Sequence, residues 1–235
     1  MLGRQRAPAL LQPAQVPPRV DREERPRHHR QEPPDRYLST PRLILASASP
    51  RRRELLGRLG IPFEVLASHI PEEHPPVPPA QAIAAVALAK ALAVTADLGA
   101  ESGPAVVLGA DTEVVLDGRL LGKPRDAADA VRMLRELRGR QHEVITGLAV
   151  VELGPPGSTP RRETTAVTSR VRMAEYTDAE IEGYVATGEP LDKAGGYAVQ
   201  GLGGRLVAAV DGCLTNVIGL PLSTTRALLE RRGLL

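Results

Sequence analysis

Three consecutive arginines, Arg51, Arg52 and Arg53, stand at the predicted start of a helix. They follow Ser49-Pro50, and serine before proline is typical of a helix N-terminus, because serine caps free N–H groups and proline tolerates the first helical position. The helix dipole disfavours each cation there by about 0.3–1 kcal/mol. Two interpretations are open at this point: the first turn binds a large anion such as a phosphate group, or the arginines extend into solvent.

One carboxylate and three lysines are further candidates for chemistry. Asp111 lies within the apolar segment VVLGADTEVVL, where a buried charge must be hydrogen-bonded, paired or bound to a metal, unless it caps a turn at the end of a strand. Lys123 follows a hairpin whose other strand carries Asp111, so the two can lie near the same end of a sheet. Lys90 and Lys123 are each also typical of solvated surface lysines. Glycines surround Lys193 and Gln200 and permit a close approach of the backbone to a ligand.

Alternating strand and helix signals from Pro41 onward would position these residues. Strands are predicted in a hairpin over 105–124 that turns at Asp117-Gly118, in a strand–loop–strand unit over 195–212, and at 43–46, 63–68, 142–153 and 164–174. Helices are predicted at 50–60, 80–98, 126–138, from Thr177 or Asp178 to Thr187, and at 222–229, with an extended loop at 71–79. This mixture predicts a single α/β domain with a mixed sheet.

The composition of the 235-residue chain argues against several classes of protein. Its 42% of hydrophobic residues suffice for one sizeable core, but aromatic residues make up 2%, too few for the stacking platform that single-stranded nucleic acid needs. Cys213 is the single cysteine, which excludes an internal disulfide and indicates a reducing compartment such as the cytoplasm. No apolar run approaches the length that spans a membrane, so no membrane partner is expected.

Residues 1–40 differ from the remainder of the chain. They contain eight arginines, five acidic residues and seven prolines with almost no periodicity, which predicts a disordered Arg/Pro-rich tail. The other 22 basic and 23 acidic residues leave 41–235, the predicted folded domain, with a net charge of minus one. The basic character therefore belongs to the tail, and the domain itself is not expected to bind nucleic acid.

Five segments in the same order resemble the successive motifs of the Maf family of nucleotide pyrophosphatases: LILASASPRRRELL, GADT, GKP, GRQHEVITG and GEPLDKAGGYAVQGLGG. The resemblance covers about residues 42 to 230. It implies an α/β fold, similar to that of the ITPases, in which two lobes with a curved mixed sheet surround a cleft. It also implies hydrolysis of a nucleoside triphosphate to the monophosphate and pyrophosphate with a divalent cation, Mg²⁺ or Mn²⁺, by a homodimer.

The resemblance also implies roles for individual residues. Asp111 matches the general base of the family, and Glu72 matches an acidic residue that assists with metal or water, so these two are the expected metal ligands. Arg51, Thr112 and Gln200 match the branch that hydrolyses dTTP and UTP, whereas the 7-methyl-GTP branch has tryptophan, glutamine and glutamate there. Further positions are assigned to the phosphates or nearby: Ser47, Arg51, Arg52, Lys90, Lys123 and Lys193. Whether Asp111 takes the proton or holds the metal stays open.

Several positions depart from the family pattern. Glu113 replaces an aliphatic residue, and strand alternation places it on the same face as Asp111, where it can bind metal or raise the pKa of Asp111. The same alternation places Thr112 on the opposite face, so either a bulge redirects it or its effect on specificity is indirect. His69 and Pro71 stand where members often have acids, which would weaken metal binding.

The expected function is therefore a pyrophosphatase for dTTP, UTP and possible modified pyrimidine nucleotides, with water attacking the α-phosphorus. One alternative is a pyrophosphatase of the 7-methyl-GTP type, which differs in substrate. Another is a non-catalytic protein that senses nucleotides and whose tail recruits a partner. The presence of both Glu72 and Asp111 favours the enzyme.

Overall fold

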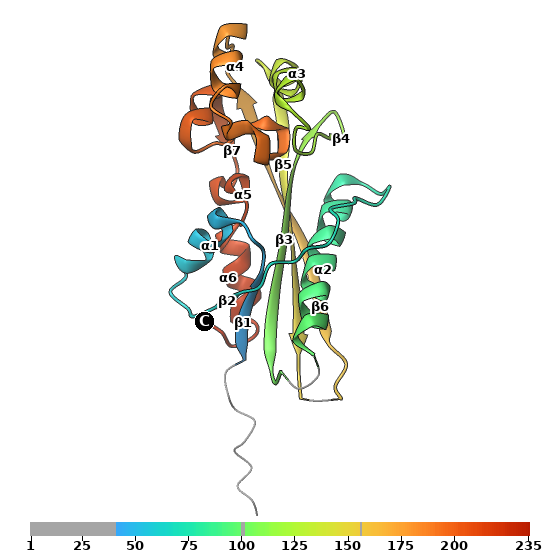
Figure 1. Ribbon diagram of the computed structural model, residues 1–235. Coiled ribbons are helices and arrows are strands. Elements are labelled where there is room, and N and C mark those ends of the chain that lie inside the picture. Colours follow the sequence, from blue (N-terminus) through green and yellow to red (C-terminus); the bar gives the residue numbers. More distant parts are fainter. Residues whose placement is uncertain (1–40, 100–101, 156) are drawn as a thin grey trace, which may run out of the picture. The chain divides into compact units, whose positions relative to one another are not determined.

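The computed structural model describes residues 41–99, 102–155 and 157–235 (Figure 1). The predicted tail over 1–40 lies outside the described residues, so the predicted domain boundary stays a prediction.

A mixed sheet of seven strands organises the part of the chain that the structure describes. The strand order is β2-β1-β3-β5-β6-β7, with β4 pairing β3 outside this path. β1 runs parallel to β2 and β3, and the later neighbours are antiparallel. The strands are β1 (Arg42–Ala46), β2 (Glu64–Val65), β3 (Ala105–Leu116), β4 (Arg119–Leu120), β5 (Gln141–Leu153), β6 (Arg161–Met173) and β7 (Val207–Asp211). The predicted α/β class with a mixed sheet is confirmed.

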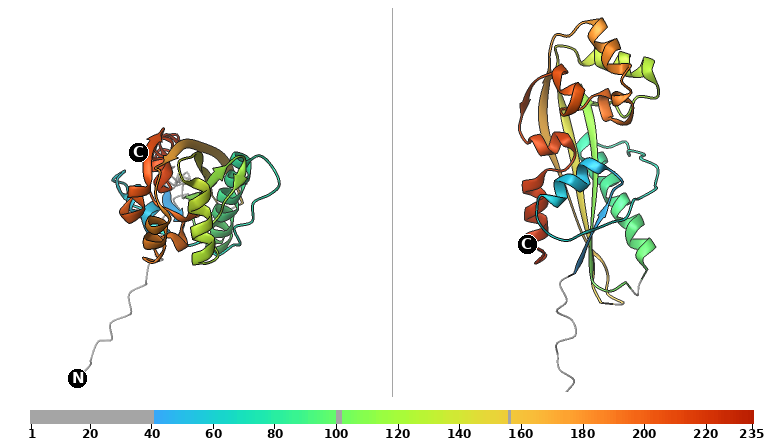
Figure 2. Two further views of the ribbon diagram at one scale, coloured as in Figure 1. Left: turned by 90° about the horizontal axis from the view of Figure 1, so that it is seen from above. Right: turned by 60° about the vertical axis from the view of Figure 1, so that its left-hand side comes forward.

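The helices gather into two groups along the long strands β3, β5 and β6 (Figures 1 and 2). Near β1, helix α2 covers one face of the sheet, and α1, α5 and α6 lie on the other. Farther along the strands, α3 and α4 pack with three short 3₁₀ helices around a second apolar core. The helices are α1 (Pro50–Gly57), α2 (Pro79–Leu98), α3 (Ala127–Leu137), α4 (Asp178–Val185), α5 (Leu214–Ile218) and α6 (Leu222–Glu230). Strands of 12 to 13 residues are long enough to join both cores, which form the two predicted lobes.

Helix α2 lies directly against the sheet, because two glycines face it. A Cβ atom on Gly109 would lie 2.2 Å from the carbonyl oxygen of Ala87, and one on Gly147 would lie 2.7 Å from Cα of Ala84. The sequence led us to expect no apolar segment of membrane-spanning length. Judged by length and composition alone, α2 is such a segment, with a mean hydropathy of 1.5. Its buried residues follow one face, and they contact β3 and β5 as expected of a core helix.

Local signals in the sequence determine most of the element boundaries. The Ser49 side chain caps α1 by accepting a hydrogen bond from the Arg52 backbone N–H at 3.4 Å, although the helix ends at Gly57, three residues before Gly60. The predicted hairpin turn is present, and both of its residues have positive φ, 50° at Asp117 and 77° at Gly118.

Two predictions about the second half of the chain and one about the first are corrected. The strand expected over 63–68 is reduced to the two residues of β2. The first strand of the predicted 195–212 unit is absent, and 3₁₀ helices η1 (Glu189–Asp192), η2 (Ala194–Gly196) and η3 (Gly201–Leu206) precede β7. Gly195, Gly196 and Gly201 have φ of 68°, 70° and 71°, which a strand cannot accommodate. Helix α5 was not expected, because five residues are too short to show a helical period.

Candidate active site

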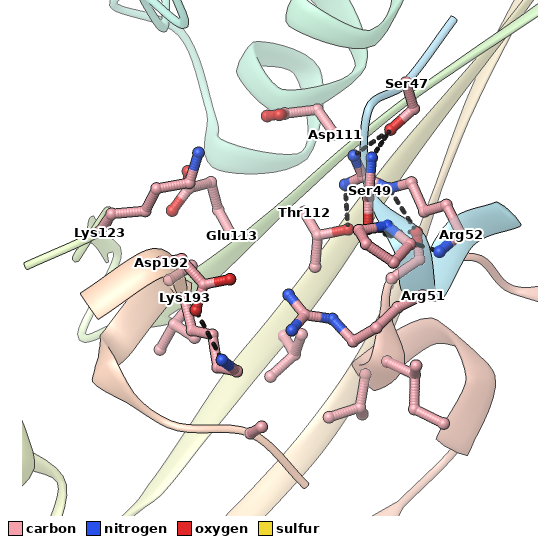
Figure 3. Close-up of a pocket in the computed structure, with 18 of the residues that line it drawn as sticks. Ser47, Ser49, Arg51, Arg52, Asp111, Thr112, Glu113, Lys123, Asp192 and Lys193 are labelled. Atoms are coloured by element: carbon pink, nitrogen blue, oxygen red, sulfur yellow. Dashed lines mark hydrogen bonds and ion pairs between the residues drawn. The ribbon is translucent and has the colours of Figure 1, made fainter. Parts of the chain in front are cut away.

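A cavity of about 490 Å³ opens beside the middle of β3, between α1 and the segment that carries η1 to η3 (Figure 3). Its volume falls in the range of small-molecule sites. The residues predicted for the site all line it: Ser47, Arg51, Arg52, Glu72, Lys90, Asp111, Thr112, Lys123, Lys193 and Gln200. The fold thus brings together side chains from six separate segments of the sequence.

Both faces of β3 reach this cavity because the neighbouring strand is shorter. β1 ends at Ala46, opposite Gly109, so within the described part of the chain no strand pairs with this edge of β3 until β4 pairs with Val115. Asp111 and Glu113 project on the α2 face, and Thr112 projects on the opposite face. The register with β5 is continuous from Ala105 to Val115, which excludes the bulge that was one explanation for Thr112.

Lys90 is the buried cation on the α2 face. Its Nζ donates to Oδ1 of Asp111 at 2.7 Å and to Oε1 of Glu72 at 2.6 Å, and only 6% of Lys90 and 3% of Asp111 are exposed. The interpretation of Lys90 as a solvated surface lysine is therefore wrong. Lys123, whose side chain is more than half exposed, donates to the other oxygen of Glu72 at 3.0 Å.

The two lysines govern the ionisation of Glu72. Burial acts to raise its pKa, but the hydrogen bonds from Lys90 and Lys123 outweigh burial and lower the pKa to about 2. Glu72 is therefore a carboxylate with both oxygens engaged by lysines. Its expected part as a metal ligand stays a prediction.

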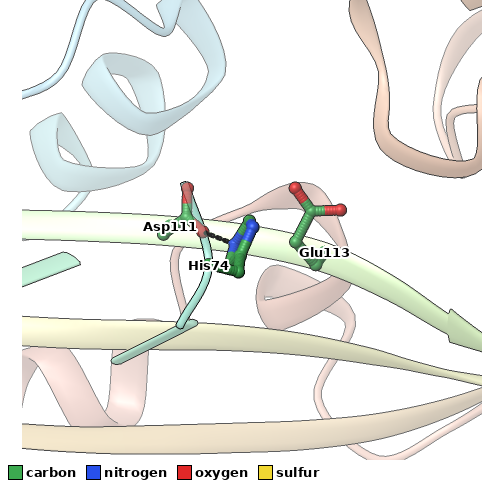
Figure 4. Close-up of side chains that lie close together, drawn as sticks. All are labelled: His74, Asp111 and Glu113. Carbon is green, nitrogen blue, oxygen red and sulfur yellow. Dashed lines mark hydrogen bonds and ion pairs between the residues drawn. The ribbon is translucent and has the colours of Figure 1, made fainter. Parts of the chain in front are cut away.

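On this face of β3, the imidazole of His74 lies between Asp111 and Glu113 (Figure 4). Nε2 of His74 lies 3.0 Å from Oδ2 of Asp111, the oxygen that Lys90 does not contact. Glu113 is 5% exposed, and its Oε2 has no hydrogen-bond partner among the described residues. Burial and then the charge of Asp111 raise the pKa of Glu113 to about 7. The sequence prediction missed His74, for which the one signal is a histidine close after Glu72 in the loop that leads to α2.

The three arginines of α1 have three different environments. Arg52 donates to the carbonyl oxygen of Gly219 at 2.9 Å, to Oγ of Ser47 at 3.2 Å and to Oγ1 of Thr112 at 2.9 Å. Arg51 points into the cavity (Figure 3), whereas Arg53 is exposed and is not among the lining residues. Arg53 therefore fits the interpretation that the arginines extend into solvent, whereas anion binding stays a prediction for Arg51 and the first turn of α1. Thr112 is one of the groups that orient Arg52, which supports an indirect influence of Thr112 on the site.

Lys193 and Gln200 belong to the glycine-rich segment across the cavity from α1. Nζ of Lys193 donates to the carbonyl oxygen of Glu189 and to Oδ1 of Asp192, both at 2.6 Å. Gln200 is exposed immediately before η3, and its side chain makes no capping hydrogen bond to that helix. The positive φ of Gly195 and Gly196 lets the backbone turn sharply here, which places Lys193 beside the cavity.

Comparison with known proteins identifies the class. The model of the Maf family, described as "Maf-like protein", matches residues 42–232, and the chain therefore belongs to the Maf family. The chain is 55% identical over 195 residues to the dTTP/UTP pyrophosphatase of Moorella thermoacetica, covering 82% of this chain and 95% of that protein. It is 50% identical over 202 residues to the dTTP/UTP pyrophosphatase of Anaeromyxobacter dehalogenans, again covering 82% and 95%. The corresponding protein of Gloeobacter violaceus is 51% identical over 185 residues, covering 78% and 92%.

A solved structure from Mycobacterium abscessus, described as a nucleoside-triphosphatase or dITP/XTP pyrophosphatase, is 17% identical in sequence. The match has a TM-score of 0.38 and covers 81% of this chain and 94% of that one.

Proposed function

We propose that this protein is a nucleoside triphosphate pyrophosphatase that hydrolyses dTTP and UTP to the monophosphate and pyrophosphate. The observation that carries this proposal is the cavity beside β3, where buried carboxylates face a set of cations: Arg51, Arg52, Lys90, Lys123 and Lys193. The names and the 50–55% identity of the relatives in the Maf family support dTTP and UTP as the substrates.

The cations of the cavity suit a triphosphate. A nucleoside triphosphate bound to one divalent cation still carries about two negative charges, which Arg51 and Lys193 can neutralise by charge-assisted hydrogen bonds. The first turn of α1 adds backbone N–H groups at the positive end of a helix dipole. Arg52 is held by three hydrogen bonds, so its role is to support this wall of the cavity and the orientation of Ser47.

The carboxylates of β3 suit a divalent cation, Mg²⁺ or Mn²⁺. Lys90 binds Oδ1 of Asp111 and leaves Oδ2 without a contact to this lysine. Glu113 adds a buried oxygen, Oε2, that has no partner among the described residues. These carboxylate oxygens are ligands that fit a hard cation. When bound, the cation would supply charge stabilisation to the phosphates. Asp111 presents Oδ2 to the reacting centre, and Glu72 positions Lys90 and Lys123.

The test is product analysis with a panel of nucleotides: UTP, dTTP, CTP, GTP and 7-methyl-GTP, each with Mg²⁺ or Mn²⁺. We expect monophosphate and pyrophosphate, with kcat/KM for UTP and dTTP at least ~10-fold above the others, the discrimination expected of a site that hydrogen-bonds a base edge. In ¹⁸O-labelled water, the label should enter the monophosphate, because water attacks the α-phosphorus. Tight binding of UTP without turnover would refute the enzyme in favour of a nucleotide sensor.

Arg51 and Arg53 provide a matched pair for the phosphate-binding part of this proposal. Removing a charge-assisted hydrogen bond costs about 1.5–3 kcal/mol, so Arg51→Ala should raise KM for UTP at least ~10-fold. Arg53→Ala removes an equal charge from the same turn but does not line the cavity, and KM should be unchanged. Equal effects of the two variants would show that general electrostatics, rather than contact in the cavity, binds the phosphates.

We further propose that the protein acts as a homodimer in the cytoplasm. The family resemblance supports the dimer, and the single cysteine suits a reducing compartment. Light scattering coupled to size-exclusion chromatography would measure the mass in solution, and a monomer at micromolar concentration would contradict the dimer.

A further inference from the structure

Three potential metal ligands converge beside the middle of β3. His74 comes from the loop before α2, and Asp111 and Glu113 come from alternate positions of the strand, with the imidazole between the two carboxylates (Figure 4). One ligand atom from each lies within 4.8 Å of the other two, and Nε2 of His74 is 3.0 Å from Oδ2 of Asp111. Two ligands at about 2.0–2.2 Å from one ion and at right angles to each other would be about 3 Å apart. The His74–Asp111 pair already has that separation.

The buried oxygen of Glu113 is a second, independent observation that points to a ligand. Glu113 is 95% buried by accessible area, since 5% of it is exposed, and its Oε2 has no hydrogen-bond partner among the described residues. A buried carboxylate oxygen is costly unless a donor or a cation satisfies it. Lys90 is not that cation in this arrangement, because its Nζ donates to Asp111 and Glu72 and leaves Oε2 of Glu113 without a partner among the described residues.

Lys90 also decides which oxygen of Asp111 remains available. It binds Oδ1, which leaves Oδ2 directed toward His74. A metal ion between Oδ2, Nε2 and the Glu113 carboxylate would therefore lie on the side of Asp111 away from the ammonium group. The two carboxylates supply the negative charge that a divalent cation needs.

The imidazole makes this donor set selective. Mg²⁺ prefers oxygen ligands and keeps much of its water shell, whereas imidazole suits the later first-row divalent metals. We propose that His74, Asp111 and Glu113 form a metal site that binds Mn²⁺ and later first-row divalent cations in preference to Mg²⁺. This inference rests on the proposed function, because the same cation would serve nucleotide hydrolysis. It adds the identity of the preferred metal and the residues that bind it.

The experiment uses the full-length protein, stripped of metal and without nucleotide, so that binding is measured apart from turnover. The loss of the free Mn²⁺ signal in electron paramagnetic resonance gives Kd, and displacement by Mg²⁺ gives the preference. We expect Mn²⁺ to bind at least ~10-fold more tightly than Mg²⁺, and pulsed measurements to show coupling of bound Mn²⁺ to an imidazole ¹⁴N. Replacing even outer-shell partners weakens metal binding about 10- to 100-fold, so His74→Ala should raise Kd at least ~10-fold and abolish the nitrogen coupling. Glu113→Gln should raise Kd similarly but keep the coupling.

Matched variants test three of the other four histidines as the source of nitrogen; the fourth, His142, is 3% exposed and its Nε2 is hydrogen-bonded to the Tyr197 hydroxyl. His69 is exposed and lies five positions before His74 in the chain, so His69→Ala should leave both Kd and the nitrogen coupling unchanged. The double variant His28→Ala/His29→Ala tests the adjacent pair in the predicted tail in the same way. Thermal unfolding in EDTA verifies that each variant is folded.

The proposal is overturned if wild-type protein shows no ¹⁴N coupling, if His69→Ala removes it, or if Mg²⁺ displaces Mn²⁺ at equal concentration. These readouts are separate from catalysis. Hydrolysis of UTP without nitrogen coupling would refute the metal site and leave the proposed function standing. Selective Mn²⁺ binding without hydrolysis of any nucleotide would do the reverse.

Discussion

Replacing Lys90 by methionine removes a buried cation from between two carboxylates while keeping an unbranched apolar side chain that is one heavy atom shorter. Asp111, 3% exposed, would lose the hydrogen bond to its Oδ1 and keep His74 as its neighbour, whereas Glu72 would keep Lys123. Removing one partner of a buried ion pair costs about 3–5 kcal/mol, because the other charge stays buried without compensation. We therefore expect Lys90→Met to lower the free energy of unfolding by about 3 kcal/mol.

Lys123→Met is the matched control, because it also removes an ammonium group that contacts Glu72. The Lys123 side chain is 53% exposed, and exposed ion pairs contribute about 0–1 kcal/mol. Urea unfolding of both variants in EDTA measures the difference. Equal losses of stability in the two variants would refute the view that burial of the Lys90–Asp111 pair determines its energetic importance.

A double-mutant cycle isolates the pair itself. If Lys90 and Asp111 stabilise each other, Lys90→Met/Asp111→Asn should be more stable than the sum of the two single changes predicts, by about 1–3 kcal/mol for groups in direct contact. A coupling energy near zero would show that the cost of Lys90→Met arises from packing of its hydrocarbon chain, and the electrostatic reasoning would fail.

Three further predictions concern activity and pH. Asp111→Asn should lose at least ~100-fold in kcat at saturating metal while remaining folded, and near-normal kcat would remove Asp111 from the chemistry. Gln200→Glu should lose at least ~5-fold in kcat/KM on both UTP and dTTP, because the carboxylate offers no donor to O4 of the base and an unpaired acceptor costs about 1–3 kcal/mol. Unchanged kinetics would show that Gln200 does not contact the base. Burial lowers the pKa of His142 to about 4, so the unfolded state, with a pKa near 6.5, binds more protons between these values. The free energy of unfolding should therefore fall by up to about 3 kcal/mol as the pH drops from 6.5 to 4, and urea unfolding of His142→Gln should lack this dependence.

Features that depend on neighbouring residues could be predicted from the amino-acid sequence. The cap of α1 by Ser49 and the turn at Asp117-Gly118 follow from side chains and backbone angles within a few positions. Strand alternation correctly placed Glu113 on the face of Asp111 and Thr112 on the other, because the period of a strand is local geometry. The motifs likewise indicated the family, and the residues they named line one cavity.

Which of these residues are buried, paired or directed into the cavity depends on long-range contacts in the folded chain. Arg52 reaches Thr112 and Gly219, which are 60 and 167 positions away, and no local pattern distinguishes it from the exposed Arg53. His74 meets Asp111 across 37 positions, because the loop before α2 passes the face of β3 that carries Asp111 and Glu113. Lys90 is buried because its helix, α2, packs closely against glycines of the sheet. Contacts of this kind depend on the order of strands and on the depth at which helices pack, and both are properties of the whole chain.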